Sequence, residues 1–435
     1  MTTRCTRRQV LFGSLALPAA VFTAEAKPAV SLVSETFSQQ VLPTQYAGPT
    51  PVTGFNGHVP GPTLRLGRSE RLSVQFANRL DVPTAIHWHG IRGPNAMDGV
   101  PGLTQAPVAP AGRFDYAFRV PDAGTFWYHA HHRSHEQVAR GLFGALVVED
   151  DNPPDVDHDI VATLTDWLLA RDGSIDPQFE RRHDIAHAGR LGNFVRAFVP
   201  DVVLVRGQRI RLRLVNAATD RVFGVDIAGL DGAVVAVDGM PLPAPRALQR
   251  LVLAPAQRVD VIADVTDEVA LDMAHRMGPY PLARLAVDGA QPARDTAIAP
   301  VPPNTVVAPG APDRQLTLDM AGGAMGPRHA GDGIWAFNGH SGMPETPLLR
   351  AARGETVRLT LANHTRFPHG IHLHGHHFHE VTADGGLGDY RDTTLVPANA
   401  SRDILCVFDN PGRWMLHCHM LSHQFGGMKT WLEVS

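Results

Sequence analysis

The chain has 435 residues, a formal net charge of −4 and only three cysteines. This length is enough for roughly two to four domains, and so few cysteines exclude a fold that depends on a network of disulfides. The mildly negative charge gives no reason to expect a nucleic-acid partner.

The N-terminal residues have the pattern of an export signal. Arg7 and Arg8 precede an apolar stretch from Val10 to Val21, and an A-x-A site follows at Ala24 to Ala26. This pattern predicts a signal peptide at residues 1–26. The arginine pair favours the twin-arginine type over an ordinary secretory signal, so we expect export, to a bacterial periplasm. No stretch reaches the ~20 apolar residues of a membrane helix, so we expect no membrane span.

A pattern of strand and turn residues occurs three times along the chain. The stretch from Phe55 to Gly90 resembles that from Phe337 to Gly375, and a third copy runs from Leu204 to Gly229. Within each copy apolar and polar residues alternate, and Gly, Asn and Pro bound the alternating runs, which predicts strands rather than helices. We therefore expect an all-β chain of three consecutive β-sandwich domains, at residues 27–150, 151–305 and 306–435.

The middle copy differs from the other two at one position. In the first and third copies an asparagine stands nine residues before a histidine (Asn78 and His87; Asn363 and His372). In the middle copy Asn216 is followed nine residues later by Val225. We expect the middle domain to be a spacer that keeps the fold without the histidines.

Four H-x-H pairs lie in the first and third domains. They are His87 and His89, His129 and His131, His372 and His374, and His417 and His419. Residues i and i+2 of a strand point to the same face, so each pair places two imidazoles side by side. One such pair is usually an ordinary feature of a strand, but four pairs in two repeated domains indicate metal binding. Imidazole suits copper, zinc, iron and nickel alike, so the pairs do not choose the metal.

Cys418 lies within the last of these pairs and indicates the metal. Strand alternation directs Cys418 to the face opposite its flanking histidines, where it can meet His369, His423 and Met428. Two histidines and a cysteine with a weak thioether ligand are typical of blue copper, whereas structural zinc sites usually have four strong ligands. The sequence thus predicts two metal sites on opposite faces of one strand, joined by its backbone. If Cys418 binds metal there is no disulfide, and Cys406 is expected to be a small core residue.

These motifs resemble those of the multicopper oxidases, which are laccase-like enzymes built from cupredoxin domains. H-W-H-G and W-Y-H-A-H stand in the first domain, and H-x₂-H-x-H-G and H-C-H-x₃-H-x₄-M stand in the third. The resemblance covers essentially the whole chain after the signal and implies three cupredoxin-like Greek-key β-sandwiches with four copper ions. It assigns a type 1 copper to His369, Cys418, His423 and axial Met428, and a type 2 copper to His87 and His372. It assigns the type 3 copper pair to His89, His129, His131, His374, His417 and His419.

The resemblance also implies a reaction. One-electron oxidation of a small reducing substrate at the type 1 copper would supply the four-electron reduction of O₂ to water at the other three coppers. An axial methionine lowers the copper potential and favours electron-rich donors, and the chain has no methionine-rich insertion of the kind that holds Cu(I). We therefore expect phenols or aromatic amines as donors. The alternative is a secreted oxidase of cuprous or ferrous ions that serves copper tolerance.

Two other functions fit the sequence less well. Copper nitrite reductases share the fold, but they have two such domains per chain and no ligand equivalent to His419. Non-catalytic scaffold relatives have lost copper ligands, whereas this chain keeps the full set.

Reduction of O₂ consumes protons, and Asp98 is the expected donor. Asp98 matches the position of an acid that has this role in related bacterial enzymes, although an Asp-Gly turn is the alternative explanation. Gln424 stands where many relatives have a glutamate, which puts a second proton donor in doubt. The nearby His132, His135, His376, His377 and His379 are expected to be solvated or to lie beside the ligands.

Overall fold

The structure is a computed structural model that describes residues 1, 29–324 and 333–435. The signal peptide expected at residues 1–26 therefore lies outside the described residues, apart from Met1. Strands account for most of the described chain and the helices are short, which confirms the all-β prediction. We call the strands β1–β8 domain 1, β9–β18 domain 2 and β19–β29 domain 3.

Domain 1 consists of two four-stranded sheets, in the orders β2-β1-β4-β6 and β3-β8-β7-β5. Apolar side chains of both sheets meet in one buried core, which includes Phe76 and Phe126. The alternating residues of β4 are alternately buried and partly or fully exposed, as the period-two pattern predicts. The strands are β1 (Val30–Gln39), β2 (Thr50–Phe55), β3 (Gly61–Gly67), β4 (Arg71–Asn78), β5 (Ile86–His89), β6 (Arg113–Arg119), β7 (Gly124–Ala130) and β8 (Phe143–Glu149).

Domain 2 contains a sheet in the order β10-β9-β12-β16-β13-β14, with β15 paired to β13 and β17 paired to β16, and a small β11-β18 sheet. Its core is the large apolar cluster around Leu212 and Val225. The strands are β9 (His158–Trp167), β10 (Phe194–Phe198), β11 (Leu204–Arg206), β12 (Arg209–Asn216), β13 (Phe223–Val237), β14 (Met240–Ala247), β15 (Leu251–Leu253), β16 (Arg258–Met273), β17 (Tyr280–Leu285) and β18 (Val287–Ala290).

Domain 3 again pairs two sheets, in the orders β20-β19-β22-β27-β24-β25 and β21-β29-β28-β23-β26. Cys406 is buried in its core, and neither Cys406 nor Cys418 forms a disulfide with another described residue. The strands are β19 (Arg314–Gly322), β20 (Trp335–Phe337), β21 (Leu349–Ala351), β22 (Glu355–Asn363), β23 (His369–Leu373), β24 (Phe378–Val381), β25 (Leu387–Arg391), β26 (Thr393–Val396), β27 (Ser401–Phe408), β28 (Gly412–Cys418) and β29 (Lys429–Val434).

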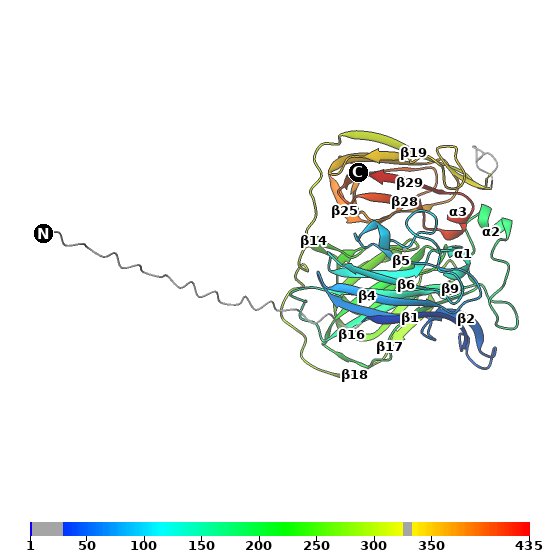
Figure 1. The fold of residues 1–435 in the computed structure, drawn as a ribbon. Coiled ribbons are helices and arrows are strands. Elements are labelled where there is room, and N and C mark those ends of the chain that lie inside the picture. The colour runs from blue at the N-terminus through cyan, green and yellow to red at the C-terminus, as the bar shows by residue number, and fades with distance from the viewer. Residues whose placement is uncertain (2–28, 325–332) are drawn as a thin grey trace.

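The three domains contact one another in several regions. Figure 1 shows the short helices α1 (Ser134–Gln137), α2 (Arg182–Ala186) and α3 (Leu421–Phe425) together at one side, one helix from each domain. Elsewhere β14 of domain 2 contacts β25 of domain 3. The domain boundaries expected near residues 150 and 305 stay predictions, and they fall in the connections β8–β9 and β18–β19.

The same asparagine corner occurs in each domain. The side-chain amide of each asparagine donates to two backbone carbonyls, and its oxygen accepts from the backbone N–H two residues later. The three residues are Asn78, Asn216 and Asn363. Each asparagine thereby fixes the turn that leads from one sheet into the next strand.

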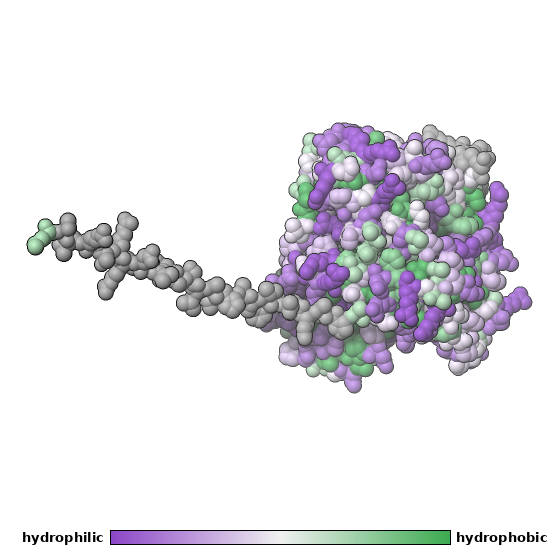
Figure 2. Space-filling model, in the orientation of Figure 1, coloured by the Kyte–Doolittle hydropathy of each residue, from purple (hydrophilic) through white to green (hydrophobic). Residues whose placement is uncertain are grey.

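The surface is of mixed character. Figure 2 shows hydrophilic and hydrophobic residues interspersed over the visible face of the molecule. In the described part of the chain, no helix has the length and apolar character needed to cross a membrane.

Candidate metal centres

Two strands of domain 1 and two of domain 3 bring the predicted histidines together. β5 pairs with β7, which places His87 opposite His129. β23 pairs with β28, which places His372 opposite His417. The two strand pairs meet across the domain boundary, where the ring centroids of His87 and His374 are 3.9 Å apart. The two regions of sequence that carry H-x-H pairs therefore form one site.

Cys418 and two histidines form a buried group on one face of β28. The Sγ atom of Cys418 lies 3.7 Å from Nδ1 of His369 and 3.8 Å from Nδ1 of His423. The two nitrogens are 3.0 Å apart, and all three residues are 0% exposed. Met428 is buried in the same apolar cluster as Cys418, and its carbonyl oxygen accepts a hydrogen bond from the Cys418 N–H. The structure thus brings the residues predicted for this site into one buried region.

Hydrogen bonds fix the outer nitrogen of each imidazole in this group. Nε2 of His423 donates to the backbone carbonyl of His187, which follows α2 of domain 2, over 2.7 Å. Nε2 of His369 lies 2.8 Å from the hydroxyl of Thr365, and this hydroxyl can donate in turn to Asn363. With both Nε2 atoms protonated, both Nδ1 atoms direct lone pairs into the space beside the sulfur. This donor set fits a copper ion of the blue type.

Burial sets the charge of this group. It lowers the pKa of His423 to about 4 and lowers the pKa of His369 well below its ordinary value. Burial also raises the pKa of the Cys418 thiol. The imidazoles are therefore neutral, which is the form that binds metal, whereas the thiol requires a bound cation to become a thiolate.

Eight further histidines form one buried cluster, half from domain 1 and half from domain 3. They are His87, His89, His129, His131, His372, His374, His417 and His419. The most exposed of them is His131, at 6%. The rings of His89 and His372 stack with centroids 3.7 Å apart across the domain boundary, and those of His129 and His419 are 5.2 Å apart. His417 and His419 belong to this cluster while Cys418 faces the other group, as strand alternation predicts.

Hydrogen bonds also hold the outer nitrogens of most of these eight rings. Nδ1 of four rings donates to backbone carbonyls: His87 to Asp98, His129 to Ala130, His372 to Asp392 and His417 to Cys418. Nδ1 of His374 donates to Oδ2 of Asp98 over 2.9 Å. His89 has the opposite orientation, because its Nε2 lies 2.9 Å from Oδ1 of Asp392. Outer bonds of this kind fix the tautomer and leave the other nitrogen free for a metal.

Several inner nitrogens of the cluster lack a hydrogen-bond partner. Nε2 of His87, His131 and His372 and Nδ1 of His89 are buried without a hydrogen bond. Nε2 of His374 and Nε2 of His417 are 3.0 Å apart although both rings already donate through Nδ1, so two lone pairs face each other. Burial and neighbouring histidines lower the pKa of both rings, so a shared proton is unfavourable. The arrangement therefore fits metal cations.

Asp98 contacts the cluster directly. It follows the 3₁₀ helix η1 (Asn95–Met97), is 7% exposed and binds the rings of His374 and His87 through its carboxylate and its carbonyl. It also lines a small cavity with Trp88 and Met97. The Asp-Gly turn is present too, because Gly99 has a φ of +81°. The turn and the contact to His374 occur together, so neither explanation of Asp98 excludes the other.

Gln424 lies on another side of the cluster. It lines a pocket of about 440 Å³ together with His131, His135 and Lys429. No acidic side chain is among the described residues that line this pocket. No neighbouring carboxylate in this pocket therefore takes the place of the glutamate that many relatives have at this position.

The other histidines near the motifs join neither group. His376 and His377 are buried, but Nδ1 of His376 meets the carbonyl of His374 and Nε2 of His377 lies 3.4 Å from Asp392. His379 meets a backbone carbonyl in β25. His135 packs on Phe425 beside the pocket, which His132 also lines.

Four residues beside the predicted ligands were not predicted from the sequence; three contact a ligand, and the fourth pairs with one of these three. They are Thr365, His187, Asp392 and Arg258. Thr365 and His187 hold the outer nitrogens of the Cys418 group, whereas Asp392, with Arg258 beside it, contacts His89. None of them lies in an H-x-H or H-C-H pattern, so spacing along the chain gave no signal for them.

Comparison with protein families gives matches over most of the chain. Three family models described as multicopper oxidase match residues 38–153, 159–271 and 310–435. These ranges include every residue of the two groups.

Individual proteins match over similar lengths. The multicopper oxidase MmcO of Mycobacterium tuberculosis is 31% identical over 99% of this chain and 93% of its own. Copper resistance protein A of Pseudomonas syringae pv. tomato is 26% identical over 94% of each chain. The crystal structure of Lac15 from a marine microbial metagenome has a TM-score of 0.82 at 47% identity, and the match covers 94% of this chain and 100% of that one.

Proposed function

The chain belongs to the multicopper oxidase family, and we propose that it oxidises small phenolic or similar electron-rich donors beside Cys418 and reduces O₂ to water within the imidazole cluster. Its membership makes it a copper-dependent oxidoreductase that uses O₂ as acceptor. The three β-sandwiches are accordingly cupredoxin-type domains.

We assign four copper ions to the chain. His369, Cys418, His423 and Met428 would hold a type 1 copper, and His87 and His372 would hold a type 2 copper. The remaining six histidines of the cluster would hold a type 3 pair: His89, His129, His131, His374, His417 and His419. When bound, these ions would accept electrons from the donor one at a time and deliver them to O₂.

One observation carries this assignment. Nε2 of His374 and Nε2 of His417 lie 3.0 Å apart with no proton to share, inside a cluster where several other inner nitrogens are buried without a partner. Buried polar atoms without partners are costly. Cations at the centre of the cluster would give these nitrogens partners and remove this cost.

The protein's own groups supply protons and an entry point for the donor. The carboxylate of Asp98 touches His374 and borders a small cavity, so it can pass protons between solvent and the cluster. On the other face of β28, Nε2 of His423 reaches the carbonyl of His187 at a partly buried position. We propose that the donor binds near His187, because this hydrogen bond is partly buried, whereas the one between Thr365 and His369 is buried.

Phenols are the preferred donor class in this proposal. A site that oxidises Cu(I) would be expected to have thioether sulfurs near the donor site. Met320 is buried in the core of domain 3, however, and Met343 lies at the pocket that contains His131 rather than near His187. The second candidate is oxidation of cuprous or ferrous ions, which the match to a copper resistance protein favours. For either donor we propose export, in agreement with the signal peptide predicted from the sequence.

Oxygen uptake across a panel of phenols, Cu(I) and Fe(II) tests reaction and donor together. We expect a blue protein with four coppers per chain that consumes O₂ faster with phenols than with either ion, and copper-free protein as the control should consume none. Faster uptake with Cu(I) or Fe(II) would favour the second candidate. One copper or none in protein reconstituted with excess copper would contradict the assignment.

A further inference from the structure

A buried carboxylate beside the imidazole cluster joins all three domains. Asp392 lies between β25 and β26 of domain 3 and is 0% exposed. Its Oδ1 lies 2.9 Å from Nε2 of His89 in domain 1, and its backbone oxygen accepts from Nδ1 of His372 over 3.0 Å. One residue thus holds the outer nitrogens of two histidines that stack on each other from different domains.

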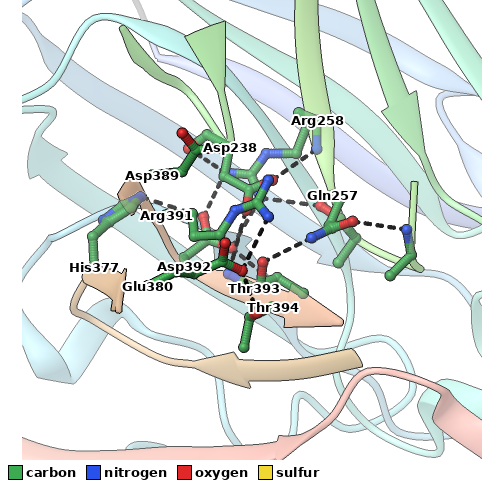
Figure 3. Close-up of polar contacts among 12 residues, drawn as sticks. Asp238, Gln257, Arg258, His377, Glu380, Asp389, Arg391, Asp392, Thr393 and Thr394 are labelled. Carbon is green, nitrogen blue, oxygen red and sulfur yellow. Dashed lines mark hydrogen bonds and ion pairs between the residues drawn. The ribbon is translucent and has the colours of Figure 1, made fainter. Parts of the chain in front are cut away.

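Arg258 of domain 2 binds this carboxylate through both oxygens. Nη1 of Arg258 lies 3.0 Å from Oδ1 of Asp392, and Nη2 lies 2.5 Å from Oδ2. Figure 3 shows the arginine and the aspartate facing each other, with Asp238 and Arg391 beside them. The pair is completely buried, so solvent does not weaken it. Arg258 is therefore the cation that fixes the direction of the Asp392 carboxylate.

The other donors of Arg258 are also occupied, which fixes its own position. Nη1 donates to the carbonyl of Ala256, Nη2 to that of Asp238 and Nε to that of Thr125. A lysine has three donors on one atom and cannot reproduce this planar set. The orientation of the pair therefore depends on the guanidinium group and not only on its charge.

The chain leaves space for the pair directly after His89. Gly90 has a φ of +84°, and a Cβ atom there would lie 2.4 Å from Nη2 of Arg258 and 2.6 Å from Oδ2 of Asp392. Both contacts are too short for a real side chain. The glycine of the H-W-H-G motif is thus required where Arg258 and Asp392 meet.

We propose that Arg258 is a positioning residue for the copper cluster, although domain 2 supplies no ligand to it. A carboxylate can accept a hydrogen bond but not donate one, so Asp392 keeps the proton of His89 on Nε2 and leaves Nδ1 facing the cluster. Arg258 keeps Asp392 in the orientation that does this. The inference rests on the proposed ligand set, and it makes domain 2 part of the copper site.

The test compares two arginine-to-lysine variants. Arg258→Lys removes the bidentate contact to Asp392. Arg211→Lys is the matched control, because Arg211 is 2% exposed and pairs with Asp150 and Asp260 without contacting a predicted ligand. Copper retention of each holoenzyme is measured against a series of chelator concentrations, with the electron paramagnetic resonance signal of type 2 copper and the blue absorption as separate readouts.

We expect Arg258→Lys to bind copper at the cluster about 10- to 100-fold more weakly and to change the type 2 signal, with the blue absorption intact. Arg211→Lys should lower thermal stability by a similar amount and keep wild-type copper retention. Equal copper loss in both variants, or wild-type retention in Arg258→Lys, would overturn the inference. Asp392→Asn is the second variant. Its amide has one acceptor oxygen and cannot accept from both Nη2 of Arg258 and Nε2 of His89 as the carboxylate does, so it should lose cluster copper as well, and wild-type retention would again overturn the inference.

These outcomes are distinct from a failure of the proposed function. Wild-type protein that binds no copper would contradict the proposed function itself. Wild-type protein that binds copper, together with an unaffected Arg258→Lys variant, would contradict only the role of Arg258.

Discussion

Domains 2 and 3 share one corner and use it differently. In domain 3 the amide of Asn363 closes a turn, and nine residues later His372 enters the imidazole cluster. In domain 2 the amide of Asn216 closes the same turn, and nine residues later Val225 enters the apolar core, where it is 0% exposed. The backbone arrangement is thus the same, and the side chain that follows decides whether a metal ligand or a core residue results.

This difference indicates that the asparagine corner stabilises the fold, and that the residues placed around it determine whether a domain binds metal. Domain 3 has a further hydrogen-bonded chain, in which the Asn363 side chain accepts from the Thr365 hydroxyl and this hydroxyl contacts Nε2 of His369. Domain 2 adds Arg258 instead of a ligand. Removing an added residue should therefore affect function more than folding, whereas removing a corner asparagine should affect folding in any domain.

Cys418→Ser should have the largest effect on function, because the blue colour and oxidase turnover both depend on this residue. A serine hydroxyl is a poor copper ligand, so we expect the blue colour and oxidase turnover to be abolished while the eight-histidine cluster keeps its copper. Absorption spectra, copper per chain and oxygen uptake check this expectation. The melting temperature of the copper-free variant should stay close to that of copper-free wild type. A variant that remained blue would disprove the assignment of Cys418.

Asp98→Asn tests the contact between Asp98 of domain 1 and His374, a cluster histidine of domain 3. The amide oxygen can still accept from Nδ1 of His374, so copper should be retained. The amide cannot carry protons, and we expect turnover to fall about 10²- to 10³-fold. Steady-state oxygen uptake measures the loss, and anaerobic bleaching of the blue colour by a phenol, which needs no proton delivery to O₂, should be unchanged. Unchanged turnover would mean that protons enter elsewhere, for example through the pocket at Gln424.

The sequence predicted repeated features better than single contacts. Strand alternation predicted the opposite directions of Cys418 and His417, because the period of two holds wherever β28 is regular. The three-domain fold was predictable because the pattern around Asn78, Asn216 and Asn363 recurs. Arg258 and Asp392 are far apart in the sequence and meet only when domains 2 and 3 pack, so no local pattern could reveal the pair. Nor could the sequence show that the Asp-Gly turn and the cluster contact of Asp98 occur together.

The pH dependence of stability should separate domains with ligands from the domain without them. Burial lowers the pKa of His131, His369 and His417 far below the ordinary value, and that of His423 to about 4. Below a pH of about 6.5 the unfolded chain binds protons that the folded chain does not, so the free energy of unfolding falls as pH drops toward about 4. The loss is about 1.4 kcal/mol per histidine per pH unit.

Calorimetry of the copper-free protein between these pH values measures the total loss. Among the described residues, the buried histidines all lie in domains 1 and 3. Amide hydrogen exchange should therefore accelerate first in β5, β7, β23 and β28, and later in β12 and β16 of domain 2. A melting temperature that stayed constant over this range would mean that the folded protein already holds protons on these rings.

Replacing the corner asparagines should have the smallest effect on function, and the loss of stability should be similar in domains 2 and 3. Asn216→Ala leaves two carbonyls and one N–H of domain 2 without a partner, which costs about 2–4 kcal/mol of stability, and Asn363→Ala should cost about as much in domain 3. Denaturant unfolding of copper-free protein measures both losses. Only Asn363→Ala should also shift the blue absorption, because the Thr365 hydroxyl then keeps only the carbonyl of Phe367 as acceptor and changes its direction beside His369. If Asn216→Ala shifted the blue absorption equally, the corner of domain 2 would be coupled to the copper site by contacts other than those of Arg258, and the separation of fold from chemistry would not hold.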